Sequence, residues 1–391
     1  MKRDKIRILH VVGGLDRGGI ETFLMHVLRR RNREQLQMDF VAHQPGGGAY
    51  DNDVLALGSR IFRCPFTSRP LKYSRELRRI LREQGPFDVV HTHVHHYDGH
   101  VLRVAHDAGV PVRVSHSHND TSHFDDAAGI ARRIYLSQMK RSIERHATLG
   151  FACSRLAAAS LFGAGWEGDA RWKLLPYGID LKPFRETADR EATRRELGVS
   201  PDAVLAIHIG RFDPQKNHQY LIDVATEIAR REPKFHLLLL GKGDLQPGIE
   251  RRVQELGLSD QITFAGSRPD VPRCLMAADV FLMPSLHEGL PLAALEAQAA
   301  GLPAVIADTI TPEIAIVPEL VQFLSLAQTP SEWAQVAMRT ANTPPAVPQG
   351  HARTTVEQSL CNIETSVARL ENFYHDAFAA PLVRPAELSL A

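Results

Sequence analysis

The sequence has few cysteines, and they are not paired. Cys64, Cys153, Cys274 and Cys361 are scattered singly over 391 residues, with no CxxC spacing. A disulfide framework or a zinc-thiolate site needs clustered cysteines, so the sequence predicts neither. The pattern fits a protein that works in a reducing compartment.

Long hydrophobic runs are also missing. The first apolar stretch covers only residues 6–12 and is interrupted by Arg7 and His10. It is too short for the core of a signal peptide, and no other run approaches the roughly 18–20 apolar residues that span a bilayer. We therefore expect a cytoplasmic protein whose contact with the inner face of the cytoplasmic membrane, if any, is peripheral.

The chain has almost no net charge, but its charge is unevenly distributed. With 46 basic and 45 acidic residues the net charge is +1, which gives no reason to expect nucleic acid as a partner. Residues 1–185 carry 29 basic and 19 acidic residues, a net of +10, and the remainder carries 17 and 26, a net of −9. The two halves are electrostatically different.

The remaining composition, with 44% hydrophobic and 23% charged residues, is that of a globular protein, and the length predicts two domains. Short Val/Ile/Leu-rich runs predict strands at 6–12, 38–43, 60–64, 88–93, 112–116, 149–153, 204–209, 236–240, 262–265, 280–283 and 304–306. Segments of helical period predict helices at 20–31, 71–83, 100–108, 130–145, 155–162, 218–231, 247–256, 271–277, 291–300, 330–340 and 356–378.

Nearly continuous apolar strands that alternate with helices are typical of parallel sheets covered on both faces. The sequence thus predicts an α/β protein of two tandem doubly wound Rossmann-like domains. We place the first domain at residues 1–184 and the second at 185–355, followed by a helix at 356–378 and a tail at 379–391.

In such folds, ligands bind at the carboxyl ends of the strands. The first strand is followed by GGLDRGGIETF, in which glycines such as Gly18 and Gly19 lead into a helix. Free backbone amides at a helix start suit an anion or a closely approaching ligand. The loop is neither GxGxxG nor a Walker motif, so it predicts neither a dinucleotide site nor a P-loop.

A second strand end carries two cations. The segment GRFDPQKNH places Arg211 and Lys216 around a turn just before a helix. A guanidinium that binds two oxygens and a compact ammonium together suit a diphosphate, although solvated surface cations give the same pattern.

The third segment is HEGLPLAALEAQAAG. Glu288 precedes the predicted helix 291–300, and Glu296 lies within it. The backbone amides of Gly289 to Leu292 are free to meet phosphate oxygens or sugar hydroxyls. The alternative is that acidic residues near a helix start only complement its dipole.

Together with PYGID at 176–180, these motifs resemble the retaining family-4 glycosyltransferases of the two-Rossmann-domain (GT-B) type, most closely the exopolysaccharide and lipopolysaccharide group. The resemblance covers about residues 5–378. It implies two domains that face each other across a cleft, with a final helix that crosses back to the first. It also implies transfer of a sugar from a nucleoside-diphosphate sugar, a UDP-sugar above all, to a lipid-linked or saccharide acceptor, with no metal or other cofactor.

The resemblance also implies roles for single residues. Arg211 and Lys216 hold the diphosphate, Glu296 the ribose hydroxyls, Glu288 the donor sugar, and the loop with Ser267 and Arg268 frames the base. The full donor-binding prediction is Gly18, Gly19, Gly210, Arg211, Lys216, Gly241, Ser267, Arg268, Glu288, Gly289, Leu290, Pro291, Leu292 and Glu296. Catalytic roles are expected for His118, Glu288, Arg211 and Lys216. Asn217, Tyr177 and Leu290 depart from common family residues, which weakens any transfer of sugar specificity.

Nineteen histidines are present, and many follow two strands of the first half. The resemblance assigns a donor-sugar contact to His118, with His116 as the fallback, and His93, His95 and His116 are candidates for the acceptor side. The rival interpretation is a metal-dependent hydrolase, in which HxH after a strand binds a metal together with Asp98, Asp120, Asp125 or Asp126. That interpretation leaves Arg211, Lys216 and the two glutamates unexplained.

Two further interpretations remain. A nucleotide-sugar epimerase on the same fold turns over donor alone, whereas a glycosyltransferase releases nucleoside diphosphate only with an acceptor. A binding module without catalysis is the last alternative.

The predicted helix 71–83 carries basic residues on one face. Arg75, Arg78, Arg79 and Arg82 recur at helical spacing, and the segment 130–145 adds five more: Arg132, Arg133, Lys140, Arg141 and Arg145. Such a face is either solvated or docks on an anionic membrane.

Overall fold

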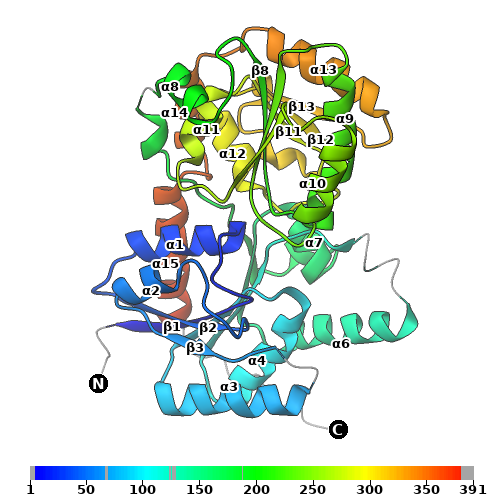
Figure 1. Ribbon diagram of the computed structural model, residues 1–391. Helices are drawn as coiled ribbons and strands as arrows, with labels where there is room; N and C mark the ends of the chain where they lie inside the picture. Colours follow the sequence, from blue (N-terminus) through cyan, green and yellow to red (C-terminus); the bar gives the residue numbers. More distant parts are fainter. Residues whose placement is uncertain (1–4, 67–68, 123–124, 126–128, 187, 380–391) are drawn as a thin grey trace. The chain divides into compact units, whose positions relative to one another are not determined.

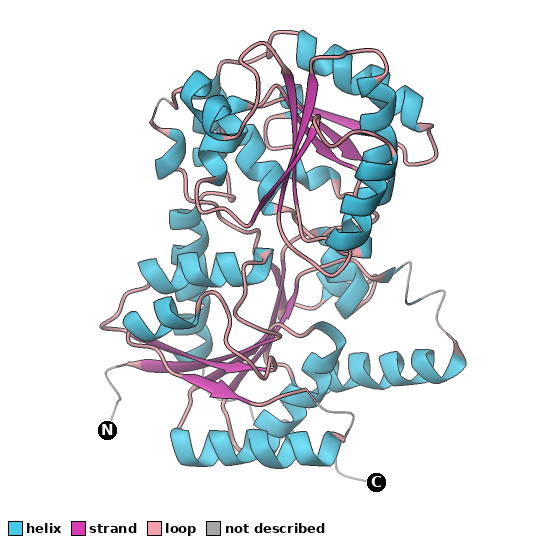
Figure 2. Cartoon of the chain, in the orientation of Figure 1, coloured by secondary structure: helices cyan, strands magenta, loops and turns pink. Residues whose placement is uncertain are grey.

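The computed structural model describes residues 5–66, 69–122, 125, 129–186 and 188–379. The chain forms two compact units: unit 1 comprises residues 1–175 and 364–391, and unit 2 comprises residues 176–363. Each unit contains a parallel sheet between helices, as the strands and helices of Figures 1 and 2 show. The predicted α/β architecture of two doubly wound units is confirmed.

The sheet of unit 1 has seven described strands in the order β3-β2-β1-β4-β5-β6-β7. Their bounds are β1 Ile6–Val12, β2 Leu36–Ala42, β3 Ile61–Arg63, β4 Val89–Thr92, β5 Val112–Ser117, β6 Leu149–Ala152 and β7 Trp172–Leu174. The central strands β1, β2 and β4 are almost fully buried, which explains their nearly continuous apolar sequence.

Helices cover both faces of this sheet, with α1 and α15 on one face and α3 and α4 on the other (Figure 1). The helices of unit 1 are α1 Gly19–Arg30, α2 Asp51–Ala56, α3 Pro70–Gln84, α4 Asp98–Asp107, α6 Ile130–His146, α7 Arg155–Phe162 and α15 Ile363–Ala379. On α3, the apolar Leu77, Ile80 and Leu81 are buried while the arginines are exposed, as the helical spacing predicts.

The sheet of unit 2 has six described strands in the order β10-β9-β8-β11-β12-β13. Their bounds are β8 Val204–Ile209, β9 Phe235–Leu240, β10 Ile262–Gly266, β11 Val280–Met283, β12 Ala304–Ala307 and β13 Val321–Leu324. The helices are α8 Arg190–Glu196, α9 His218–Ala229, α10 Gln246–Glu255, α11 Val271–Ala277, α12 Leu292–Ala299, α13 Pro330–Asn342 and α14 Gln349–Glu357.

The prediction of one last helix at 356–378 is wrong, because the structure has α14 and α15 separated by Gln358–Asn362. The interruption has a tertiary cause. Ile179 donates its backbone N–H to the carbonyl of Cys361 and accepts one from Ile363, and it forms an isolated bridge with Asn362, so the chain leaves the helix in a turn here. The chain leaves unit 1 between Leu175 and Pro176, whereas the sequence placed that boundary at residue 184.

In both sheets the strand order reverses once, between β1 and β4 in unit 1 and between β8 and β11 in unit 2. In open parallel sheets such a switch point is where ligands bind. The loops that follow these four strands contain the glycine-rich segment, His93, the Arg211–Lys216 turn and Glu288. Among the described residues, no helix has the length and hydropathy needed to cross a bilayer.

Candidate functional site

At the switch point of unit 2 the structure brings Lys216 and Glu288 together. The Lys216 ammonium lies 2.5 Å from one carboxylate oxygen of Glu288, and Gln215 Nε2 donates to the other at 3.0 Å. The two charged side chains are only 15% and 8% exposed. Removing two charged groups from water costs free energy of desolvation, which can offset their attraction. The pair is therefore more readily explained by a functional role than by a contribution to stability.

The same turn is fastened to the loop after β11 by further hydrogen bonds. Gln215 donates to the carbonyl of His287 and accepts from the backbone of Leu286, and Asn217 donates to Pro284. Asn217 adopts left-handed backbone geometry with φ 55° and begins α9. Hydrogen bonds therefore connect the loops after β8 and β11, and this connection fixes the position of the Lys216–Glu288 pair.

Two glycines allow the strand ends of unit 2 to approach closely. A Cβ on Gly241, whose φ is +139°, would lie 1.9 Å from the carbonyl oxygen of Gly210. A Cβ on Gly210 would meet the Lys216 side chain at 2.9 Å. Glycine at these positions lets the Lys216 side chain lie against the backbone of the strand end.

Arg211 differs from Lys216 in its surroundings. Its side chain is 65% exposed and reaches Asp213 at 3.5 Å. An exposed, weakly paired guanidinium is available to an incoming anion. The structure thus puts one predicted cation in a buried pair and the other on the surface of the same turn.

Glu296 is the fifth residue of α12 and thus lies within the helix, as the sequence predicts. Its side chain is half-buried, and burial raises the pKa of its carboxyl to about 7. Pro291 is the N-cap of α12, and the two residues before it, Gly289 and Leu290, are buried. Leu292 is the first residue of the helix.

The remaining predicted donor contacts lie after β10. Ser267 is exposed, and Arg268 makes two hydrogen bonds to Asp270, at 2.8 and 2.7 Å. The Arg268 charge is therefore already neutralised by a carboxylate. A contact through the backbone, as the resemblance implies, does not need that charge.

Sequence reasoning missed three side chains of this region: Gln215, His208 and His218. Gln215 lies inside the GRFDPQKNH motif, next to Lys216, so its position in the sequence could have predicted that it belongs to the site. His208 donates from Nδ1 to the carbonyl of Leu282 at 2.7 Å, and His218 stacks on Phe212. Both histidines are buried beneath the turn, and burial lowers the pKa of His218 to about 4.

In unit 1, the glycine-rich loop after β1 leads into α1 as predicted. Gly18 is the N-cap and Gly19 the first residue of the helix. A Cβ on Gly18 would lie 2.4 Å from the Glu21 carboxylate, while one on Gly19 would meet nothing within 4 Å. The loop thus leaves open space beside the start of α1.

The histidines of unit 1 form two hydrogen-bonded rows. In the first, His10 Nδ1 lies 2.9 Å from His93 Nε2, and His93 Nδ1 lies 2.8 Å from His118 Nε2. In the second, Tyr374 of α15 lies 2.6 Å from His91 Nδ1, and His91 Nε2 lies 3.2 Å from His116 Nδ1. The predicted His93, His116 and His118 therefore belong to one cluster.

Burial makes these rings neutral. It lowers the pKa of His10 to about 3 and the pKa values of His91, His93, His116 and His118 well below the usual range. His116 is fully buried and His118 half-buried, so His118 is the better placed of the two to meet a ligand. Contact of His93 or His116 with an acceptor stays a prediction.

His95 lies apart from both rows. Its Nε2 is 2.7 Å from the Thr121 hydroxyl, and its backbone adopts φ 56°, which is uncommon for a residue other than glycine. Its neighbour His96 pairs with Asp125 at 2.8 Å.

The same histidines include groups that could hold a metal ion. Two trios, His10/His91/His93 and His93/His116/His118, have ligand atoms within 4.8 Å of one another. Both ring nitrogens of His93 already face other histidines at hydrogen-bond distance. The carboxylates of the rival interpretation are not in these trios: Asp98 accepts from Thr92 and Ser115, and Asp126 lies outside the described residues.

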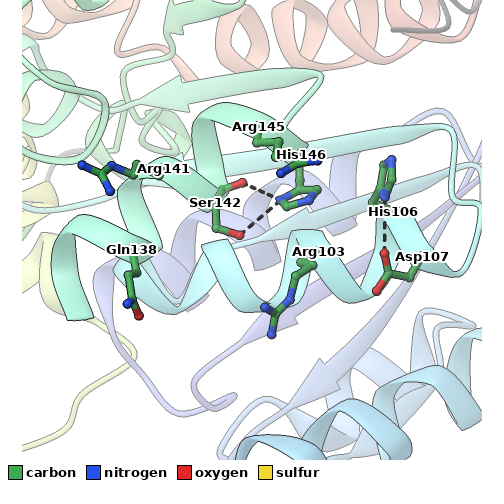
Figure 3. A pocket seen from close by; sticks show the side chains of 8 residues that line it. All are labelled: Arg103, His106, Asp107, Gln138, Arg141, Ser142, Arg145 and His146. Carbon is green, nitrogen blue, oxygen red and sulfur yellow. Dashed lines mark hydrogen bonds and ion pairs between the residues drawn. The ribbon is translucent and has the colours of Figure 1, made fainter. Parts of the chain in front are cut away.

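A basic pocket lies on the surface of unit 1, between α4 and α6 (Figure 3). His146 faces Ser142 along α6, and His106 contacts Asp107 at the end of α4. The lining residues are Arg103, His106, Asp107, Gln138, Arg141, Ser142, Arg145 and His146. Three of these eight side chains are arginines, which concentrates positive charge there.

Two family models match the chain in succession. Residues 18–178 match the description "Glycosyl transferase 4-like domain", and residues 189–336 match "Glycosyl transferases group 1". The matched residues include Gly18, His118, Lys216 and Glu288.

Individual proteins agree with these models. The chain is 37% identical to the "putative glycosyltransferase EpsF" of Bacillus subtilis over 87% of this chain and 89% of that one. It is 25% identical, over 78% of this chain and 80% of the other, to an Escherichia coli enzyme named "UDP-Gal:alpha-D-GlcNAc-diphosphoundecaprenol alpha-1,3-galactosyltransferase".

Among solved structures, HepE of Anabaena in complex with UDP-glucose superposes with a TM-score of 0.79 at 19% identity, covering 95% of this chain and all of that one. This likeness concerns the fold. The comparisons support neither the epimerase nor the metal-dependent hydrolase. With two successive family models and a relative of this identity and coverage, the chain belongs to the family-4 glycosyltransferases of the two-Rossmann-domain type.

Proposed function

We propose that the protein transfers a sugar from a nucleoside-diphosphate sugar, a UDP-sugar above all, to an acceptor hydroxyl with retention of anomeric configuration. The observation that carries the proposal is the buried Lys216–Glu288 pair, fixed beside the exposed Arg211 at the switch point of unit 2. The group that leaves in such a transfer is a diphosphate, and two cations at one turn are suited to it.

In this proposal the turn lowers the barrier by holding the leaving diphosphate. An ammonium carries three N–H donors, so Lys216 can hold Glu288 and still donate to phosphate oxygens. Arg211 supplies a second, exposed charge. Donors held in place where negative charge develops stabilise the transition state more than the ground state, and no metal ion is needed for that role.

The carboxylates serve the other parts of the donor. Lys216 and Gln215 hold both oxygens of Glu288, which keeps this group oriented beside the sugar, where it stabilises positive charge at the anomeric carbon. Glu296 binds the ribose hydroxyls, as the family resemblance implies. With no protein nucleophile assigned, the expected mechanism is front-face attack by the acceptor, assisted by the leaving phosphate.

The relatives support the substrate classes. HepE was crystallised with UDP and with UDP-glucose, and the E. coli relative is named for a UDP-galactose donor and a diphosphoundecaprenol-linked acceptor. We infer a UDP-sugar donor and a lipid-linked or saccharide acceptor in cell-surface polysaccharide assembly.

A lipid-linked acceptor places the enzyme at the inner face of the cytoplasmic membrane, and α6 offers a suitable surface. Ile130, Ile134 and Tyr135 are exposed there next to Arg132 and Arg133. Apolar side chains flanked by arginines are typical of helices that lie in the membrane interface. On α3 the arginines are partly neutralised, since Arg79 pairs with Glu76 and Glu83.

The experiment that tests the proposed function is a screen of nucleotide sugars. A ligand that binds only the folded protein raises its melting temperature, so the true donor is expected to stabilise it. That donor is then incubated with and without lipid-linked acceptors. Conversion of the donor into an isomeric nucleotide sugar without any acceptor, and with no net release of nucleoside diphosphate, would support an epimerase instead.

Docking is tested by sedimentation with anionic and neutral vesicles at low and high salt. We expect salt-sensitive binding to the anionic vesicles, at roughly 1 kcal/mol per basic residue near the surface. Replacing Arg132 and Arg133 by Ala should weaken it more than replacing Arg75, Arg78, Arg79 and Arg82 together. Equal binding to both vesicle types would contradict the docking proposal.

A further inference from the structure

The first histidine row of unit 1 runs from the interior toward the surface. His10 lies in β1, His93 directly follows β4, and His118 directly follows β5. His10 is 0% exposed, His93 is 5% exposed, and His118 is half-buried. The row thus starts in the core beside the switch point and ends at the histidine to which the family resemblance assigns the donor sugar.

Only two arrangements of hydrogens fit this row. A neutral imidazole has one N–H and one nitrogen that accepts, and burial keeps all three rings neutral. In the first arrangement His10 donates to His93, and His93 donates to His118, whose own hydrogen is then on Nδ1. In the second every bond is reversed, so His118 donates from Nε2 and His10 carries its hydrogen on Nε2.

The surroundings of His10 distinguish the two arrangements. Its Nε2 is buried and finds no hydrogen-bond partner among the described residues, and its ring stacks on Phe40 at 5.5 Å. The second arrangement would leave a buried N–H without an acceptor, whereas the first leaves only an unused lone pair. Orphaned buried N–H groups are rarer in proteins than unused acceptors, so the first arrangement is favoured.

We infer that the His10–His93–His118 row fixes His118 in the tautomer with its hydrogen on Nδ1, so that His118 acts as a hydrogen-bond donor to an oxygen of the nucleotide sugar. His10 and His93 are positioning residues in this arrangement. The inference rests on the proposed function and deepens it, because His118 then cannot serve as a general base through Nδ1. Its ligand is a sugar hydroxyl or a phosphate oxygen.

The second row does not compete for these atoms. His91 contacts Tyr374 through Nδ1 and His116 through Nε2, while His93 uses its two nitrogens for His10 and His118. The two rows lie against each other, with the His91 and His93 rings 4.2 Å apart, but each has its own hydrogen bonds. His91 therefore provides a matched control for His93.

The tautomer is read directly by ¹⁵N NMR of the full-length protein with labelled histidine and no substrate. We expect a protonated Nδ1 and a bare Nε2 for both His10 and His118. In His93→Phe, His118 loses its donor and is expected to revert to the Nε2–H form that free histidine side chains prefer. His93→Gln, whose side-chain NH2 donates and whose carbonyl oxygen accepts, is expected to retain the Nδ1–H form, as is His91→Phe.

Kinetics connect the tautomer to the reaction. We expect His93→Phe to lower kcat by about 10- to 100-fold with little change in KM for the nucleotide sugar, because a lost donor to developing charge acts mainly on the transition state. His93→Gln is expected to restore most of kcat. Equal losses in the two variants would overturn the positioning role.

Other outcomes also decide the inference. An Nε2–H tautomer of His118 in the unmodified protein overturns it, and so does stoichiometric zinc bound by these histidines. If the tautomer is as expected but no nucleotide sugar is transferred, the proposed function fails and the inferred hydrogen arrangement stands. The two failures are therefore distinguishable.

Discussion

The two switch points of this protein are built from opposite chemistry. In unit 2 the residues after the strands are charged, and Lys216 and Glu288 are paired with little exposure. In unit 1 the corresponding residues are neutral imidazoles in hydrogen-bonded rows, although residues 1–185 carry a net charge of +10. The arginines of α3 and α6 are exposed on the surface of unit 1. Net charge in a sequence therefore says little about the charge at a site.

The largest expected effect comes from removing the charge of unit 2. Arg211→Ala should reduce kcat/KM by about 30- to 1000-fold, since a charged contact to the leaving group contributes roughly 2–4 kcal/mol, and adding Lys216→Ala should reduce it further. Steady-state kinetics measure the loss, and thermal unfolding shows that the variants are folded. Arg230→Ala removes an exposed cation of unit 2 that pairs with Glu227, and is the control. Near-normal turnover by a folded double variant would contradict the assignment of the diphosphate.

The next largest effect is on stability, and it comes from adding a side chain where two strand ends of unit 2 lie close together. Gly241→Ala should destabilise the protein by about 1–3 kcal/mol, because the new Cβ meets the Gly210 carbonyl and φ is positive. In unit 1, Gly13 follows β1 and a Cβ there meets nothing within 4 Å, so Gly13→Ala should be nearly neutral. Urea unfolding compares the two. Equal stabilities would show that the tight approach in unit 2 is relaxed in solution.

The two sites should also respond to pH with opposite signs. Burial raises the pKa of Glu296 from 4.5 to about 7, so this carboxyl lowers the free energy of unfolding as pH rises from about 4.5 to 7. Burial lowers the pKa of His10 from 6.5 to about 3, so this ring lowers that free energy as pH falls below about 6.5.

Variants isolate each contribution. The stability of Glu296→Gln relative to the unmodified protein should increase between pH 4.5 and 7. The stability of His10→Phe relative to the unmodified protein should increase as pH falls below 6.5. Urea unfolding at several pH values measures both differences, and slopes of the same sign for the two variants would contradict the contrast between the sites.

The smallest expected effect comes from chelation. If unit 1 works with hydrogen-bonded neutral histidines, protein treated with a strong chelator should retain its transfer activity. Elemental analysis should then find no stoichiometric zinc, iron or manganese. Activity that is lost on chelation and restored by one metal would assign the histidine trios to metal binding instead.

The sequence predicted most of the fold because buried parallel strands have distinctive apolar runs. The strands at 6–12 and 204–209 were predicted with the same first and last residues that the structure shows. The edge strands β7 and β13 and the short helices α2 and α8 were missed, since three to seven residues carry little periodicity. The division between α14 and α15 depends on pairing with Ile179, a contact that local sequence does not encode.

The candidate site was predictable only in part. Motif spacing identified Lys216 and Glu288, but not that they form a buried pair with Gln215 attached. His118 and His93 were noticed because each follows a strand. His10 was not, because it lies inside β1 and meets His93 through the pairing of β1 with β4, 83 residues along the chain.

The membership of α15 in unit 1 has a consequence for the order in which the protein is completed during synthesis. Unit 2 is one continuous segment and can finish folding as soon as residue 363 has left the ribosome. Unit 1 must wait, because Tyr374 fills its core and contacts His91, and Phe373 packs on Phe151. The unit that is made first is therefore finished last, and a nascent chain that stops before α15 lacks the side chains that pack on His91 and Phe151.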